Sequence, residues 1–166
     1  MAPARILLLP FGSAGDVFPF IWLGRLLTAR GHHVTMITAC LFEEQVRKTG
    51  IHFIPFGKKE EFEAMTRDPR IWKPVLGTKL VFETAASYVE PFFAAIESAG
   101  KFDLTLAPVT TFAARLAREK SGTPLISVHL QPAALLSAHA PPLLHPLIRL
   151  LRLMPLWLKR ALLTLL

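Results

Sequence analysis

The fold is decided by the stretch RILLLPFGSAGDVFP, residues 5–19. Its apolar run ends at Pro10 and enters a loop with two glycines, which is typical of a buried strand that leads into a tight turn. A helix is expected next. We place its N-cap at Phe18 and Pro19 at its first position, where a missing N–H costs nothing. Asp16 is then predicted to lie in the glycine loop, outside the helix.

Strand and helix signals alternate along the chain after this stretch. Apolar or β-branched runs predict five strands, at residues 5–9, 33–38, 52–56, 104–107 and 125–129. Helical patterns lie between them, with a long one at 78–99 that Pro91 should kink or split, and a charged surface excursion at 57–74. The pattern predicts an α/β fold, a Rossmann-like parallel sheet with helices on both faces. The loops after the first and fifth strands should meet at one ligand-binding edge.

The glycine loop is the best candidate for chemistry. Gly12, Ser13 and Gly15 offer backbone N–H groups in front of a helix N-terminus, an arrangement that favours a phosphate. The dinucleotide fingerprint fails on glycine spacing and on the missing acid after the second strand, and the Walker motif lacks Gly-Lys-Ser/Thr. Asp16 has two interpretations that spacing leaves open, a helix-capping residue or a chemical group that faces the crevice.

Composition and charge exclude several function classes. The 166 residues are 52% hydrophobic, as expected for one packed globular domain. Residues 1–119 carry 14 Lys/Arg and 12 Asp/Glu, whereas residues 120–166 carry five cations and no acid, so the net charge of +7 comes mainly from the tail. This distribution does not predict a nucleic-acid-binding face. No secretory signal is visible and Cys40 is the single cysteine, so we expect a cytoplasmic protein.

Several motifs resemble those of a known enzyme family. The segments GSAGDVFPF (12–20), LG (23–24) and RGHHVT (30–35) are similar to the opening of sterol, glycopeptide and macrolide glycosyltransferases that use nucleotide sugars. Within this group, residues 12–21, DPRIW (68–72) and LLSAHAPP (135–142) most resemble the rhamnosyltransferase of rhamnolipid synthesis. The resemblance spans about residues 5–145.

The resemblance implies the N-terminal half of a GT-B fold, in an inverting glycosyltransferase that needs neither a metal nor a cofactor. Residues 1–142 would form the acceptor-binding domain, with Asp16 as the catalytic base and the loop of Gly12, Ser13 and Gly15 near the donor diphosphate. The His-Gly-Gly segment that grips the donor in this family is missing from the chain. We therefore expect residues 1–166 alone to be inactive. A second acid that supports the base in plant relatives has no counterpart in Leu106–Pro108.

Other side chains are weaker candidates for acceptor contact. Phe18 lies near the loop, His129 and Gln131 follow the fifth strand, and His139 lies in a segment that carries the resemblance. A structural role is the alternative for each. Aromatic side chains in the middle of the chain would either line an apolar acceptor pocket or belong to the core; they are Trp72, Phe82, Tyr88, Phe92 and Phe93.

The tail, residues 143–166, is Leu-rich and basic. At helical spacing its cations fall on one side and leave a broad apolar face. The face would pack on the domain or on the missing half, or would lie on an anionic membrane where a lipid acceptor is met. In isolation it should make the chain self-associate. A non-catalytic module that binds a lipid or a protein partner is the alternative to an enzyme.

Overall fold

The computed structural model describes residues 2–131, 137–139 and 153–163. The chain divides into two compact units, Met1–Val128 and His129–Leu166. The first unit holds the whole sheet and the glycine loop.

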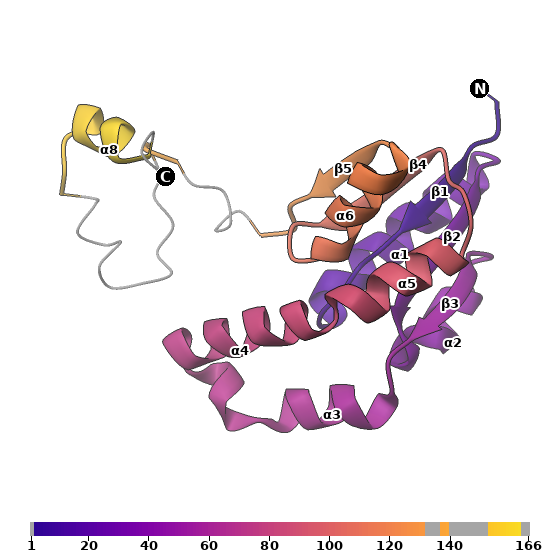
Figure 1. Ribbon diagram of the computed structural model, residues 1–166, viewed down its shortest axis with the longest axis horizontal. Helices are drawn as coiled ribbons and strands as arrows, with labels where there is room; N and C mark the ends of the chain where they lie inside the picture. Colours follow the sequence, from indigo (N-terminus) through magenta and orange to yellow (C-terminus); the bar gives the residue numbers. More distant parts are fainter. Residues whose placement is uncertain (1, 132–136, 140–152, 164–166) are drawn as a thin grey trace. The chain divides into compact units, whose positions relative to one another are not determined.

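Five parallel strands form the sheet of the first unit (Figure 1). They are β1 (Arg5–Leu8), β2 (His33–Ala39), β3 (His52–Phe56), β4 (Leu104–Pro108) and β5 (Leu125–Val128), in the order β3-β2-β1-β4-β5. The registers are parallel throughout, for example Leu7 opposite Thr35 on one side and Thr105 on the other. The prediction of a five-stranded parallel sheet is confirmed, and each strand end lies within one residue of its predicted position.

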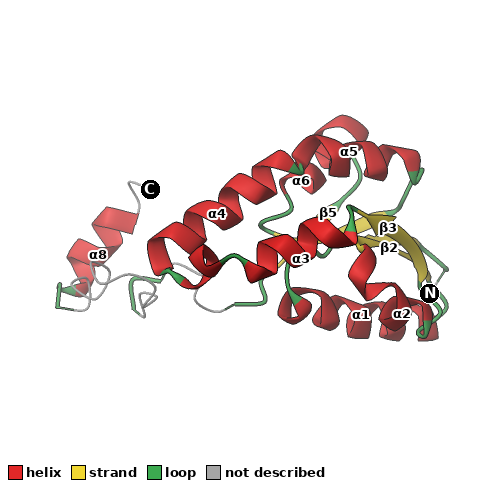
Figure 2. Ribbon diagram, turned by 90° about the horizontal axis from the view of Figure 1, so that it is seen from below, coloured by secondary structure: helices red, strands yellow, loops and turns green. Residues whose placement is uncertain are grey.

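Helices cover both faces of the sheet, as predicted (Figure 2). On one face lie α1 (Ala14–Ala29) and α2 (Glu43–Arg47), which follows the short helix η1 (Cys40–Phe42). On the other lie α5 (Val89–Ser98) and α6 (Phe112–Ser121). Helix α1 packs close to the sheet because Gly24 has no side chain; an added Cβ would lie 2.8 Å from Leu8 Cδ1. The central strand residues Leu7, Leu8 and Leu9 are fully buried between these layers.

Residues 57–88 form an arm beside the sheet, with more helix than the sequence predicted (Figure 1). It consists of α3 (Lys59–Arg67), the short helix η2 (Pro69–Trp72) and α4 (Pro74–Ser87). The predicted split of the long helical pattern is confirmed, and it falls at Tyr88, between α4 and α5. Pro91 is the third residue of α5, where its missing N–H needs no helical partner.

The second unit contains α8 (Leu156–Leu163), which is the helical part of the described tail residues 153–163. The side chains of Leu153 and Trp157 are 83% and 70% exposed. Residues 132–136 and 140–152 lie outside the described residues, and with them most of the segment LLSAHAPP (135–142) and the tail cations Arg149 and Arg152. Among the described residues, no helix is both long and apolar enough to cross a membrane.

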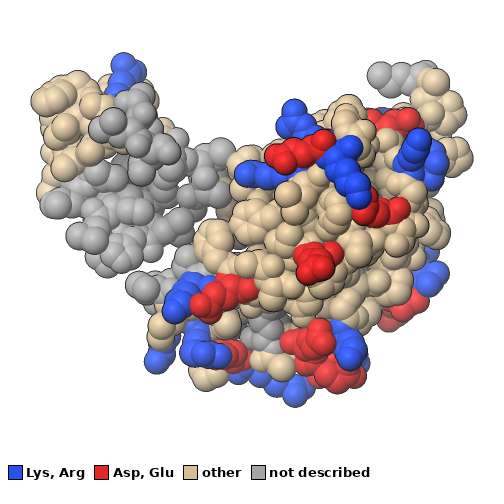
Figure 3. Space-filling view, viewed as in Figure 1, with Lys and Arg blue, Asp and Glu red and all other residues tan. Residues whose placement is uncertain are grey.

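Charged side chains are mixed on the face of the first unit that Figure 3 shows. Lys and Arg lie beside Asp and Glu, in agreement with ion pairs one helical turn apart, such as Lys59–Glu63 and Lys79–Glu83. This face has no patch of a single sign.

Candidate functional site

The candidate site lies at the carboxyl ends of β1 and β4, where the strand order changes direction. Ligands of open parallel sheets bind at such switch points. Two contacts fix the loops that meet there: the Leu9 N–H donates to Leu106 O at 2.9 Å, and the Thr111 hydroxyl donates to Leu9 O at 3.0 Å. Thr111 is buried, so the start of α6 is held against the strand that leads into the glycine loop.

Helix α1 begins earlier than predicted, and the prediction that Asp16 lies outside it is wrong. The N-cap is Ser13, and Asp16 occupies the third helical position. Its carboxylate Oδ2 accepts hydrogen bonds from the Ser13 N–H at 2.8 Å and from the Ser13 hydroxyl at 2.9 Å. These bonds replace the cap that we assigned to Phe18, and they leave Pro19 inside the helix. An acid in the first turn also interacts favourably with the helix dipole.

Gly12 provides the space that the Asp16 carboxylate fills. Its φ of +134° is a conformation that L side chains rarely adopt. A Cβ added there would overlap Asp16 Oδ2 and lie 2.9 Å from Asp16 Cγ. The glycine is therefore required both by the backbone and by the side chain above it.

The loop leaves part of its hydrogen-bonding capacity available. Asp16 is half-buried, and among the described residues no donor contacts its second oxygen, Oδ1. A carboxylate in this state can accept a proton from a hydroxyl group. Three residues are predicted to lie near the donor diphosphate. The N–H of one of them, Ser13, already donates to the Asp16 carboxylate. The diphosphate contacts of Gly12 and Gly15 stay predictions.

The predicted acceptor residues divide between the two units. Phe18 lies on α1 with half of its side chain exposed, and its ring meets the Phe42 ring edge-on at 6.0 Å. His129, Gln131 and His139 belong to the second unit and are exposed. His139 Nε2 lies 3.3 Å from a guanidinium nitrogen of Arg160. A role of these four side chains in acceptor binding stays a prediction.

An aromatic cluster lies beside the glycine loop, and the sequence analysis identified only part of it. The Phe11 ring lies 5.5 Å from Tyr88 and 6.1 Å from Phe92, and Phe62 stacks on Tyr88 with an interplanar angle of 6°. Phe56 completes the cluster, 4.3 Å from Phe92. Phe11 directly precedes Gly12, so its place beside the loop could have been inferred from the sequence, whereas Phe56 and Phe62 come from distant segments.

A small cavity of about 10 Å³ opens along the cluster, between the ends of β1 and β4. Its lining combines rings with small and hydroxyl side chains: Phe11, Ala85, Tyr88, Val89, Phe92, Thr110, Thr111, Phe112 and Ala113. Of the aromatic residues that we singled out, Tyr88 and Phe92 line it. Phe92 also belongs to the buried core, and Phe82 stacks on Phe112 from outside, half-exposed. The side chain of Trp72 lies outside the described residues.

Tyr88 carries the polar group of this cluster. Its hydroxyl donates to Glu61 Oε2 at 3.0 Å, which links α3 to the junction of α4 and α5. Burial raises the pKa of the Tyr88 phenol, and the hydrogen bond and negative charge of Glu61 raise it further. The phenol therefore stays protonated at neutral pH, and its one O–H is engaged by Glu61 while its oxygen can still accept a hydrogen bond.

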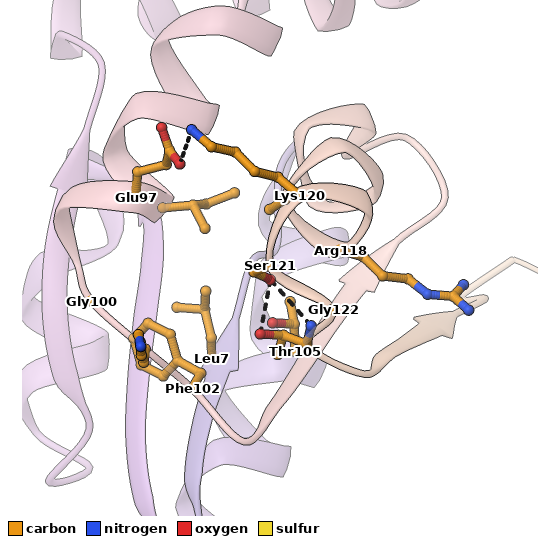
Figure 4. Close-up of a pocket in the computed structure, with 13 residues that line it drawn as sticks. Leu7, Glu97, Gly100, Phe102, Thr105, Arg118, Lys120, Ser121 and Gly122 are labelled. Atoms are coloured by element: carbon orange, nitrogen blue, oxygen red, sulfur yellow. Dashed lines mark hydrogen bonds and ion pairs between the residues drawn. The ribbon is translucent and has the colours of Figure 1, made fainter.

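A larger hollow of about 640 Å³ lies at the opposite edge of the sheet (Figure 4). It sits between the last turns of α5 and α6, above Leu7, and an ion pair of 2.6 Å joins Glu97 to Lys120 across it. Residues that precede β4 and β5, such as Phe102 and Thr123, line it. Because it lies at the amino ends of the strands, it is separate from the glycine loop. Among the described residues, no three His, Cys, Asp or Glu side chains gather closely enough to hold a metal ion.

Comparison with known proteins agrees with this geometry. The model of the "Glycosyltransferase family 28 N-terminal domain" matches residues 6–137. A sterol 3-beta-glucosyltransferase of Pichia angusta is 47% identical over 49 residues, which are 30% of this chain and 4% of that protein.

Two solved structures share the fold. The glycosyltransferase SnogD of Streptomyces nogalater superposes with a TM-score of 0.62 at 19% identity, over 90% of this chain and 39% of the other. The glycosyltransferase SsfS6 of Streptomyces sp. SF2575, solved with thymidine diphosphate, has a TM-score of 0.57 at 21% identity, over 75% of this chain and 38% of the other. The chain thus spans well under half of these glycosyltransferases. On the family match and the parallel sheet, it belongs to the glycosyltransferase family 28 N-terminal domains.

Proposed function

We propose that this domain binds the acceptor of an inverting glycosyltransferase, which moves a sugar from a nucleotide-sugar donor to a hydroxyl group of an apolar or lipid-like acceptor. The single observation that carries the proposal is the state of Asp16. One carboxylate oxygen is held by Ser13, and the other has no partner among the described residues at the switch point of the sheet. That is the position and the chemistry that a general base requires.

The reaction would proceed in one displacement. The acceptor oxygen attacks the anomeric carbon of the donor and forms the new C–O bond, while its proton passes to Asp16 Oδ1. The bond between the anomeric carbon and the diphosphate oxygen breaks, and its electron pair leaves with the diphosphate. Attack from the side opposite the leaving group inverts the configuration. Asp16 contributes both by holding the hydroxyl in place and by removing its proton.

An apolar acceptor is supported by the cavity beside the loop. The rings of Phe11, Tyr88 and Phe112 line it, and the Thr110 and Tyr88 hydroxyls are polar groups that can orient an alcohol. At about 10 Å³ the cavity holds no sugar or sterol, so acceptor binding requires the arm of residues 57–88 to move. A sterol, after which the Pichia angusta glucosyltransferase is named, is a rigid apolar alcohol of the class that we propose.

The donor would be bound mainly by a second domain outside residues 1–166. The chain covers 38% and 39% of the two solved neighbours, and the first of them was solved with thymidine diphosphate. In this division of labour, Gly12 and Gly15 add N–H groups to the leaving diphosphate across the cleft between the two domains. The donor sugar would be selected mainly by that second domain, and the location that we propose for the whole protein is cytoplasmic or peripheral to a membrane.

The test is Asp16→Asn in the enzyme that joins this domain to a donor-binding domain. The amide oxygen of Asn can still accept from Ser13, so the first turn of α1 and the melting temperature should be preserved. Turnover should fall by about 10²-fold or more, because an amide cannot accept the proton. Asp16→Glu, which keeps the carboxylate but moves it, is the matched control. Unchanged turnover in Asp16→Asn would remove Asp16 from the mechanism. A joined wild-type enzyme that transfers no sugar would instead favour a non-catalytic module that binds a lipid or protein partner.

A further inference from the structure

We propose that Ser13 is the positioning residue for the Asp16 base. Its hydroxyl holds Oδ2 of the carboxylate and thereby aims Oδ1 at the acceptor hydroxyl. This inference rests on the proposed function, and it adds a residue whose part there is separate from contact with the donor.

The geometry favours this role because both restraints on Oδ2 come from one residue. The Ser13 N–H and the Ser13 hydroxyl donate to the same oxygen at 2.8 Å and 2.9 Å. Two donors that converge on one oxygen resist rotation of the carboxylate, and hydrogen bonds to an ionised group are the strong ones. Gly12 lies next to the carboxylate and has no side chain, so it leaves the space that the Asp16 carboxylate occupies.

No other side chain among the described residues takes this part. Asp16 makes its side-chain hydrogen bonds with Ser13 alone, and the segment after β4, Val109–Thr111, contains no acid that could support it. Thr111 is committed to the Leu9 carbonyl. A base that lacks a supporting acid still needs a fixed orientation, and the hydroxyl of its own capping residue supplies it.

Ser13→Ala separates the two hydrogen bonds that Ser13 donates to Asp16. The variant keeps the N–H bond and loses the hydroxyl bond, so the Asp16 side chain should sample more than one rotamer. The fraction of enzyme with Oδ1 correctly aimed then falls. We expect kcat to drop about tenfold, with the KM values for donor and acceptor unchanged, because a correctly placed base acts in the transition state and not in substrate binding. Ser13→Thr keeps the hydroxyl and should restore most of kcat.

Two measurements test it. In the enzyme with its donor-binding domain, Ser13→Ala should lower kcat in the wild-type background and have no further effect on kcat in the Asp16→Asn background. A raised donor KM with unchanged kcat would overturn the proposal in favour of a donor contact. An equal loss of kcat in both backgrounds would overturn it as well, because Ser13 would then act independently of Asp16.

The second measurement needs no activity. In the 166-residue chain, NMR three-bond couplings at the Asp16 β-protons should report one χ1 rotamer in the wild type and in Ser13→Thr, and averaged couplings in Ser13→Ala. Couplings that are identical in all three chains would overturn the positioning role even if the enzyme is active. A wild-type enzyme that transfers no sugar would instead contradict the proposed function, so the two failures are distinguished.

Discussion

Gly12→Ala should be the most damaging single-methyl change in the glycine loop. The added Cβ has to avoid Asp16 Oδ2 and Cγ, the latter only 2.9 Å away, and the backbone has to leave its φ of +134° or bear the strain. Strain in such a conformation costs about 1–3 kcal/mol, and displacement of a well-placed side chain by a new methyl group costs about 1–3 kcal/mol more. We expect a loss of about 2–4 kcal/mol in the free energy of unfolding, since the Asp16 side chain can partly swing away.

Gly31→Ala is the matched control, because Gly31 also has a positive φ, +86°, but an added Cβ there meets nothing within 4 Å. It should lose only the strain, about 1–2 kcal/mol. For a chain of this length each kcal/mol corresponds to about 2–4 °C in melting temperature, so thermal unfolding should separate the two variants clearly. In an Asp16→Ala background the extra cost of Gly12→Ala should disappear. If the two glycine variants unfold alike, or Asp16→Ala gives no relief, the packing of Asp16 over Gly12 is refuted.

Three further predictions address the arm, the division of labour and the tail. Tyr88 is the only tyrosine of the chain, so phenolate absorbance should report its titration alone, with a pKa raised above the ordinary value of a tyrosine and lowered again by Glu61→Gln. The folded state holds this proton more tightly than the unfolded chain, so the stability that Tyr88 contributes is present below the unfolded pKa and is lost as pH rises through the folded pKa. In chemical denaturation, the free energy of unfolding of Tyr88→Phe should therefore fall less at alkaline pH than that of the wild type. The purified chain of residues 1–166 should transfer no sugar, and turnover in a coupled assay would refute the proposed division between two domains. Sedimentation should show self-association that weakens when residues 143–166 are deleted, since Leu153 and Trp157 are exposed; a strictly monomeric full chain would contradict this.

The sheet could be predicted from the sequence because its signals are local. Strands such as residues 5–8 and 33–39 are short segments rich in apolar and β-branched residues and bounded by turns, and their alternation with helices leaves few topologies for a parallel sheet. The split before Pro91 could be predicted for the same reason, since the clash between a proline and the preceding helical turn is a property of the neighbouring residues alone.

The start of α1 could not be predicted in this way. The choice between Phe18 and Ser13 as N-cap depends on which donors the Asp16 carboxylate contacts. The carboxylate packs against Gly12, and this contact becomes visible only in the folded structure. Proline at the first helical position was the stronger local rule, but the two hydrogen bonds to Ser13 and the unusual backbone of Gly12 outweighed it.

By itself, the sequence determined the α/β class and the positions of the five strands along the chain, and it directed the functional proposal to Asp16 and the glycine loop. Only the tertiary structure decided that Asp16 belongs to α1, that Ser13 holds it, and that Phe11, Phe62 and Tyr88 meet beside it although they come from segments up to 77 positions apart. The physical reason is the sequence separation over which the interactions act. Periodicity and turn chemistry depend on neighbouring residues, whereas the position of a carboxylate or a ring depends on the space, hydrogen-bond donors and apolar surface that distant segments provide.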